Sequence, residues 1–216
     1  MLIAIYQVNL IKGDTPWPPK VGDDMTKGRI EAFSDGVIAI IITIMVLELK
    51  VPHGEDWATV AKLWPIFLSY ILSFVNVGIY WNNHHHMFHA VKHVGGWVLW
   101  ANLHLLFWLS LMPFTSGFMG ENHFAPIPTF LYALNLLLCA LGYTGLVFAL
   151  VAQHGRNSDF TRALKSGRKE QLSTVIYVIS VPLALFYPMV SLALVSVVAV
   201  LWVVPDRRFA RVVERS

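Results

Sequence analysis

Long apolar runs separated by short polar breaks dominate the chain from residue 29 onward. A helix needs about 20 mainly apolar residues to cross the hydrocarbon core of a bilayer. Six runs approach that length, and breaks containing proline or glycine separate them. The pattern therefore predicts an all-α, polytopic membrane protein with six transmembrane helices. These helices are expected over Arg29–Leu49, Trp57–Phe88, Trp97–Phe118, Thr129–Gln153, Glu170–Tyr187 and Met189–Val204.

The two ends of the chain depart from this pattern. Residues 1–12 are apolar but too short to span a membrane, and they lack the basic start of a signal peptide. Residues 13–24 are rich in proline and are typical of an irregular linker. We predict a disordered leader over residues 1–26, with Met25 as a candidate true start. A transmembrane domain should follow over residues 27–205, and a basic cytoplasmic tail over residues 206–216.

The composition supports a membrane protein. Hydrophobic residues make up 56% of the chain and charged residues 13%, whereas soluble domains carry about 25% charged residues. The single cysteine, Cys139, lies in an apolar run, so a disulfide framework and a cysteine-based metal site are excluded. The net charge of +3 is explained more simply by membrane topology than by nucleic acid. We therefore expect membrane lipids as partners, and no nucleic acid.

The basic residues indicate how the chain is oriented. With six spans and a cytoplasmic N-terminus, Lys50 and Lys62 fall in outer segments, and the other 14 of the 16 Lys and Arg residues fall in inner ones. Cytoplasmic loops carry an excess of Lys and Arg. This distribution predicts that both termini are cytoplasmic and that the protein is a multi-pass protein of the cell inner membrane or plasma membrane.

In this topology, polar residues of the first three helices gather at the cytoplasmic side of the membrane. A polar group in hydrocarbon needs a partner, so these residues are expected to contact one another. One interpretation is a structural clamp that joins three helices. The polar residues are Arg29, Glu31, Ser34, Asp35, Asn82, Asn83, His84, His85, His86, His89, Asn102 and His104.

Two functional interpretations of the histidines stay open beside the clamp. Histidine has an unperturbed pKa of about 6.5, so the cluster could form a gate that senses cytoplasmic pH. His85 and His89 stand at i and i+4, a spacing that suits zinc. No Glu or Cys completes a recognisable zinc pattern with them, so we predict no bound metal. The pattern does not assign a role to His86 or His89.

A stripe of four residues runs outward along the first helix: Gly36, Ile40, Thr43 and Leu47 share one helical face. The face could pack against another helix, with the Thr43 hydroxyl bonded to the carbonyl of residue 39. Alternatively, several copies of the helix could line a narrow pore, where apolar rings gate by dewetting and hydroxyl groups contact ions. Periodicity alone does not separate these alternatives.

The sequence contains no convincing catalytic constellation. It has no G-x-S-x-G motif, no glycine-rich phosphate loop and no pair of carboxylates inside the membrane. We therefore predict that the protein is not an enzyme and that it has no cofactor.

Three motifs carry a family resemblance. Arg29-x-x-x-Phe33-Ser34-Asp35 opens the first helix, Gly78-x-Tyr80-Trp81-x-x-His84-His85 lies in the second, and the third runs from Asn102 to Ser110-Leu111-x-Pro113-Phe114. These segments resemble the lysosomal potassium channel family, and the length and layout resemble its bacterial branch. The resemblance covers about residues 27–204.

The resemblance implies a homotetrameric, potassium-permeable ion channel that lacks the usual T-V-G-Y-G filter. Its central pore would be lined by the first helix of each subunit, with a constriction at Ile40 and further pore-lining positions at Thr43 and Leu47. K⁺ and other monovalent cations would be permeant ions and not cofactors. The residues implied to brace the pore helix are Arg29, Phe33, Ser34, Asp35, Trp81, His84, His85 and Asn102. The alternative function is a proton-coupled or proton-conducting transporter that uses Asp35 and the cluster His84–His89.

Overall fold

A computed structural model describes residues 27–91, 93–155, 161 and 168–203. The predicted leader, the candidate start Met25 and the predicted tail lie outside these residues. Every element within them is helical, and none of them forms a strand, which confirms the all-α prediction. The helices are α2 (Lys27–Leu47), α3 (Trp57–Ala61), α4 (Trp64–His89), α5 (Gly96–Ser110), α6 (Met112–Glu121), α7 (Pro126–His154), α9 (Arg168–Ala184) and α10 (Pro188–Val203).

Among the described residues, four helical segments are long and apolar enough to cross a membrane. They correspond to the first four predicted spans. The last two predicted spans correspond to α9 and α10, which have 17 and 16 residues. The four long segments are Lys27–Leu47, Trp64–His89, Gly96–Glu121 and Pro126–His154.

Proline interrupts two of the predicted helices. The expectation of one continuous helix from Trp57 is wrong, because α3 ends at Ala61 and α4 begins at Trp64. Pro65 lies in the first turn of α4, where its missing N–H costs no helical hydrogen bond. In a helix interior, its ring would clash with the carbonyl four residues earlier. Pro113 likewise lies in the first turn of α6, directly after the junction between α5 and α6.

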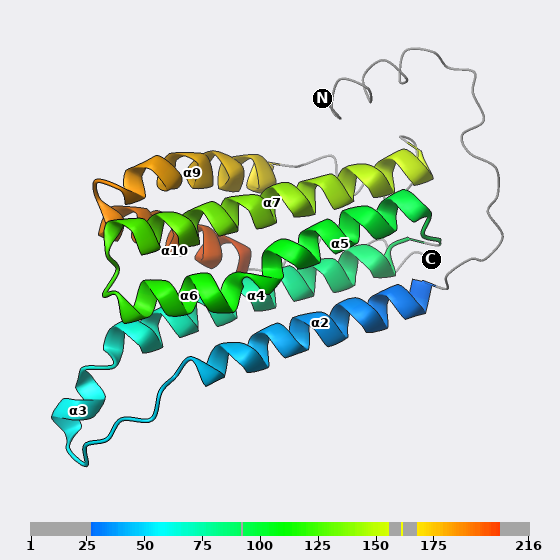
Figure 1. Cartoon of the computed structure of the whole chain (residues 1–216). Coiled ribbons are helices and arrows are strands. Elements are labelled where there is room, and N and C mark those ends of the chain that lie inside the picture. The colour runs from blue at the N-terminus through cyan, green and yellow to red at the C-terminus, as the bar shows by residue number, and fades with distance from the viewer. Residues whose placement is uncertain (1–26, 92, 156–160, 162–167, 204–216) are drawn as a thin grey trace.

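The helices form a bundle with α2 along one side (Figure 1). α2 packs against α4, α5 and α6, while α7 packs against α5, α6 and the hairpin formed by α9 and α10. The short helix α3 projects beyond one end of the bundle. The start of α2, the end of α4 and the start of α5 lie at the opposite end. The arrangement therefore brings the polar ends of the first three predicted helices together.

The outer surface of the bundle is apolar. Large side chains such as Ile71, Phe107 and Phe148 are exposed along the long helices. Exposed large apolar side chains in this number are typical of a protein that contacts membrane or partner surfaces. Together with the lengths of the helices, it indicates a protein that resides in lipid.

Candidate functional site

The helix α2 has two different faces. Its buried residues recur at spacings of three and four, so they form one face that packs on the bundle. On the other side, the side chain of Ile40 is 57% exposed and that of Leu47 is 75% exposed. Gly36 and Thr43 are exposed as well. The stripe recognised from periodicity is therefore not a packing face within one chain. The buried residues are Ile30, Ser34, Ile38, Ile41 and Met45.

The Thr43 hydroxyl is bonded within its own helix. It donates to the carbonyl oxygen of Ile40 at 2.9 Å, whereas the expected acceptor was the carbonyl of residue 39. Threonine in a helix can reach the carbonyl three or four residues earlier, depending on its rotamer, and here it takes the nearer one. Because the hydroxyl hydrogen points back to the helix, the oxygen lone pairs are left for a group outside the chain.

A buried chain of hydrogen bonds joins α2, α4 and α5. The Asn102 Nδ2 donates to Ser34 Oγ at 2.9 Å, and Asn102 Oδ1 lies 2.8 Å from His84 Nε2. With an amide oxygen as its partner, His84 Nε2 carries the hydrogen in this arrangement. All three side chains are at most 2% exposed, so no solvent replaces these partners. We call this chain the clamp.

A second hydrogen bond lies beside the clamp. The Trp81 indole Nε1 donates to Asp35 Oδ1 at 2.9 Å, which links α4 to α2. The Trp81 ring stacks on the His85 ring with centroids 5.9 Å apart. The structure thus brings together six of the eight residues expected to brace the first helix.

The other two expected bracing residues lie elsewhere on α2. Phe33 is 53% exposed and Arg29 is exposed too. Neither makes a hydrogen bond or an ion pair with another described residue. Both lie on the same side of α2 as the exposed stripe, pointing away from the clamp. Their bracing role stays a prediction, and within one chain no contact of the clamp involves them.

The remaining histidines of α4 gather without forming a metal site. The His85 ring centroid lies 4.7 Å from that of His89 and 5.7 Å from that of His86. Among the described residues, no three His, Cys, Asp or Glu side chains are placed to hold a metal ion together. The geometry gives no support to zinc binding within one chain.

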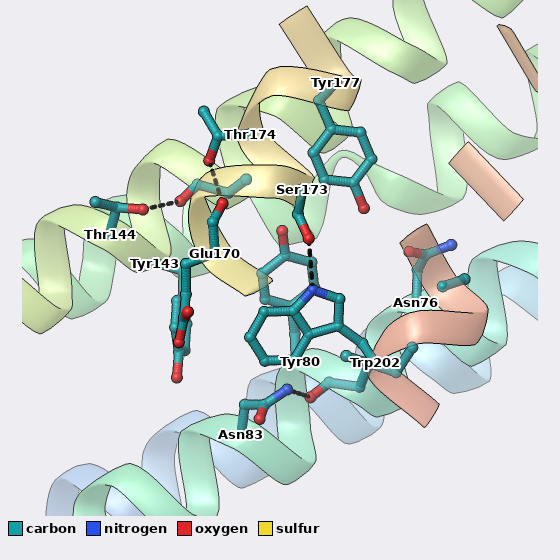
Figure 2. A pocket seen from close by; sticks show the side chains of 13 residues that line it. Asn76, Tyr80, Asn83, Tyr143, Thr144, Glu170, Ser173, Thr174, Tyr177 and Trp202 are labelled. Atoms are coloured by element: carbon teal, nitrogen blue, oxygen red, sulfur yellow. Dashed lines mark hydrogen bonds between the residues drawn. The ribbon is translucent and has the colours of Figure 1, made fainter. Parts of the chain in front are cut away.

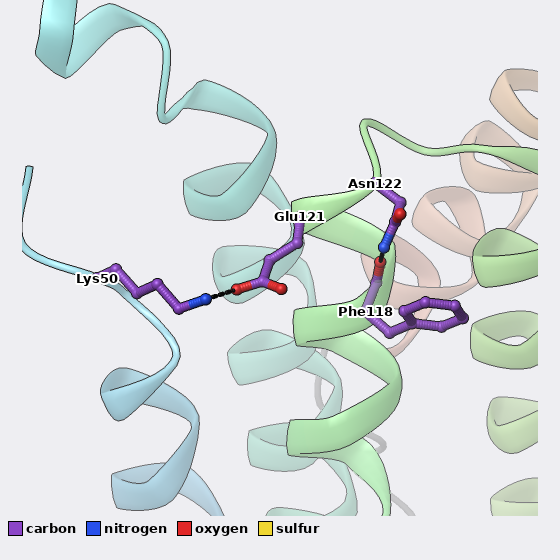
Figure 3. Close-up of polar contacts among 4 residues, drawn as sticks. All are labelled: Lys50, Phe118, Glu121 and Asn122. Atoms are coloured by element: carbon purple, nitrogen blue, oxygen red, sulfur yellow. Dashed lines mark hydrogen bonds and ion pairs between the residues drawn. The ribbon is translucent and has the colours of Figure 1, made fainter.

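The opposite end of α2 is held by a contact that the sequence reasoning missed. Lys50 Nζ lies 2.5 Å from Glu121 Oε1, so the segment after α2 is tied to the end of α6 (Figure 3). The hydrogen bond and the charge of Glu121 raise the pKa of Lys50. The sequence signal that could have predicted this ion pair is the presence of opposite charges near the ends of two predicted spans. Both side chains of the ion pair are exposed.

A groove of about 540 Å³ runs along the surface between α2 and α6. Ile40 and Ile44 line it from α2, and Phe114 and Gly117 line it from α6. Glu48 and Glu121 line it where α2 and α6 end. The groove leaves Ile40 without packing partners on this side of α2, which accounts for part of the exposure of that side chain.

The fold and the site define a class: a multi-pass membrane protein in which one long helix is clamped at its start and leaves an apolar stripe uncovered. The model of the family described as "Endosomal/lysosomal potassium channel TMEM175" matches residues 29–113. The chain belongs to the TMEM175 family, in its bacterial branch, as the sequence motifs predicted.

Two relatives and a solved structure support this membership. A protein named potassium channel from Chryseobacterium sp. (strain P1-3) is 51% identical over 87% of this chain and 97% of its own length. A potassium channel from Chamaesiphon minutus is 35% identical over 66% of this chain and 72% of its own length. The crystal structure of a lysosomal potassium-selective channel TMEM175 homolog from the same organism superposes with a TM-score of 0.72. It is 27% identical and covers 83% of this chain and 97% of its own.

Proposed function

We propose that this protein is a potassium-permeable channel that conducts K⁺ passively through a pore formed by α2 of each subunit in a homotetramer. Membership of the TMEM175 family and the names of its bacterial relatives support potassium as the permeant ion. The observation that carries the proposal is the exposed stripe of α2. A helix that is clamped on one side and bare along an apolar stripe on the other is suited to face a shared axis.

The stripe contains the chemistry that such a pore needs. Rings of Ile40 and Leu47 from four subunits would form narrow apolar constrictions that gate by dewetting. Between them, a ring of Thr43 hydroxyls offers oxygen atoms whose hydrogens are directed into the helix. Potassium holds its hydration water less tightly than sodium does, so it would cross apolar rings at a lower energetic cost. We expect moderate selectivity for potassium from this arrangement.

The clamp and the Trp81–Asp35 hydrogen bond would hold the pore helix in place. An apolar pore is sensitive to its radius, and small rotations of α2 would change which side chains meet at the axis. Buried polar partners on α4 and α5 resist such rotation, because breaking their hydrogen bonds would leave polar groups unpaired in hydrocarbon, which is costly. Arg29 and Phe33 lie on the exposed side of α2, where they would brace the helix against a neighbouring subunit.

We further propose that α9 and α10 also cross the membrane, which gives six spans with both termini in the cytoplasm of the cell. At about 1.5 Å per residue, helices of this length reach about 25 Å, somewhat less than the hydrocarbon thickness of about 30 Å. Short helices can be accommodated by local thinning of the bilayer. The protein would then lie in the inner or plasma membrane, with residues 27–205 as the channel domain.

A flux assay tests the proposal. The full chain is reconstituted into liposomes, and K⁺ flux is compared with Na⁺ flux under an imposed gradient. The substitution Ile40→Asn should raise the flux and lower the selectivity, because a polar ring no longer excludes water. Ile179→Asn is the matched control: Ile179 is 52% exposed, but it lies on α9. Unchanged flux in the Ile40 variant, with the assembly intact by light scattering, would refute the pore assignment.

The same liposomes test the transporter alternative. Proton conduction through Asp35 and the α4 histidines would acidify the lumen when a pH gradient alone is imposed. In the pore proposal those residues brace α2, so Ile40→Asn changes K⁺ flux while Asp35→Asn affects mainly the amount of folded protein. Proton flux that is abolished by Asp35→Asn and unaffected by Ile40→Asn would favour the alternative.

A further inference from the structure

A small cavity with several polar side chains in its wall lies between α4, α7, α9 and α10 (Figure 2). None of the described residues that line it belongs to α2, so it is separate from the exposed stripe. Its volume is about 50 Å³. A bound water needs about 10–15 Å³ of such volume, whereas a dry cavity that binds benzene measures about 150 Å³. The cavity therefore has room for a few waters and is too small for an aromatic ligand.

Two helices turn polar faces into this cavity. Side chains spaced by three, four and seven residues lie on one face of a helix, and both α4 and α9 place polar residues at this spacing. The α4 face lies next to the clamp, since Asn83 directly precedes His84 and Tyr80 lies one turn before it. The polar residues are Asn76, Tyr80 and Asn83 on α4, and Glu170, Ser173, Thr174 and Tyr177 on α9.

The short polar side chains around the cavity use their hydrogens within their own helices. Asn83 Nδ2 donates to the carbonyl of Ile79 at 2.9 Å, and the Thr174 hydroxyl donates to the carbonyl of Glu170 at 2.9 Å. Asn83 Oδ1 and Thr174 Oγ1 accept no hydrogen bond from another described residue. Acceptors are thus available at the wall of the cavity, and no described protein donor reaches these two.

Two tyrosines supply donors that have no acceptor among the described residues. The hydroxyls of Tyr80 and Tyr177 make no hydrogen bond to any described residue, although Tyr177 is 4% exposed. Buried polar groups in folded proteins almost always have a partner. Ordered water fills that role in cavities that are polar and large enough, whereas empty cavities are apolar.

We propose that this cavity binds a cluster of ordered waters, which bridges Tyr80 on α4 and Tyr177 on α9. The waters satisfy the two phenol groups and the acceptors on the cavity wall. They also join the α9–α10 hairpin to α4, about one helical turn from the clamp residue His84. The site is independent of ion conduction, and its ligand is water.

Radiolytic footprinting of the full chain in nanodiscs tests the proposal directly. X-rays generate hydroxyl radicals from water in place, so a buried tyrosine is oxidised when it touches bound water. Tyr132 is the matched control, because it is fully buried in the same bundle and its hydroxyl lies 3.1 Å from Ser73 Oγ. We expect Tyr80 and Tyr177 to be oxidised several-fold faster than Tyr132. Equal rates for the three residues would mean a dry cavity and would overturn the proposal.

A substitution gives a second test by the sign of its effect. Tyr177→Phe removes one hydroxyl and keeps the ring. If water binds this hydroxyl, the variant loses a hydrogen bond and Tm falls; if the cavity is dry, the variant removes an unpaired polar group and Tm stays or rises. Tyr187→Phe is the control, since Tyr187 is 64% exposed and lies outside the cavity. A Tm for Tyr177→Phe at or above that of the control would contradict the proposal.

Discussion

The clamp can be tested by replacing Asn102 with leucine. Leucine is similar in size but offers no polar atom, so Asn102→Leu removes both hydrogen bonds, at 2.8 and 2.9 Å. Ser34 can turn its hydroxyl to a carbonyl of its own helix, but His84 Nε2 would stay buried without a partner. Leaving a buried polar group unsatisfied costs about 1–3 kcal/mol. Hydrogen bonds between membrane helices contribute about 0.6 kcal/mol on average and about 1.7 kcal/mol at most. We therefore expect a loss of about 2 kcal/mol.

A double-mutant cycle separates the clamp from general packing effects. Ser34→Ala alone should cost about 0.5–1 kcal/mol, because Asn102 then loses one of its two partners. In the Asn102→Leu background, Ser34 no longer has a partner to lose, so the second substitution should add almost nothing. The coupling free energy should therefore be about 0.5–1 kcal/mol.

Equilibrium unfolding of the purified protein in mixed micelles measures these free energies. Asn122→Leu serves as the control, because Asn122 is exposed at the end of α6 and its side-chain amide donates to the carbonyl of Phe118 in the preceding turn (Figure 3). The control should stay close to the unsubstituted protein. Additive losses for Ser34→Ala and Asn102→Leu, or a loss in Asn102→Leu no larger than in the control, would refute the clamp.

Three further predictions concern the ends of the helices. Trp81→Phe keeps the aromatic ring but leaves the Asp35 carboxylate without its indole donor, so unfolding should require about 1 kcal/mol less free energy. Lys50→Glu should lower the unfolding midpoint at low salt through repulsion by Glu121, the exchange Lys50→Glu with Glu121→Lys should restore it, and 1 M salt should remove the difference. Two hydrogen bonds from Thr59 lower the pKa of Asp56 below its ordinary value of 3.8. The cap therefore stabilises α3 above that pH and is lost as the pH falls through the lowered pKa. The protection factors of the α3 amides, which correct for the intrinsic pH dependence of exchange, should therefore fall in acid, and Asp56→Asn should abolish this acid-dependent change.

Much of the fold follows from the sequence, because membrane helices obey simple rules. The length of the apolar runs identified four long helical segments, and most of the predicted ends lie within a few residues of the observed ones. The positions of Pro65 and Pro113 were visible too, yet the sequence reasoning placed them inside continuous helices. A proline in the first turn is compatible with either a helix start or a mild bend, and the neighbouring packing decides which one forms.

The candidate site divides in a similar way. Periodicity along α2 identified Ile40, Thr43 and Leu47 as one stripe, but it could not tell whether another part of the chain covers that stripe. The exposure of the stripe depends on where α4, α5 and α6 dock, which is a property of the whole bundle. The motif residues Ser34 and Asn102 could be placed at a common depth in the membrane, whereas their direct hydrogen bond depends on the rotation of both helices.

Local pattern determined which segments are helical, which residues share a helical face and which family the chain resembles. Tertiary structure alone decided the pairs formed by residues far apart in sequence, such as Lys50 with Glu121, and the cavity that both Tyr80 and Tyr177 line. The physical reason is that periodicity defines the angle of a side chain around its own helix. The partner at that angle depends on the packing of several helices at once, and no single stretch of the sequence contains that information.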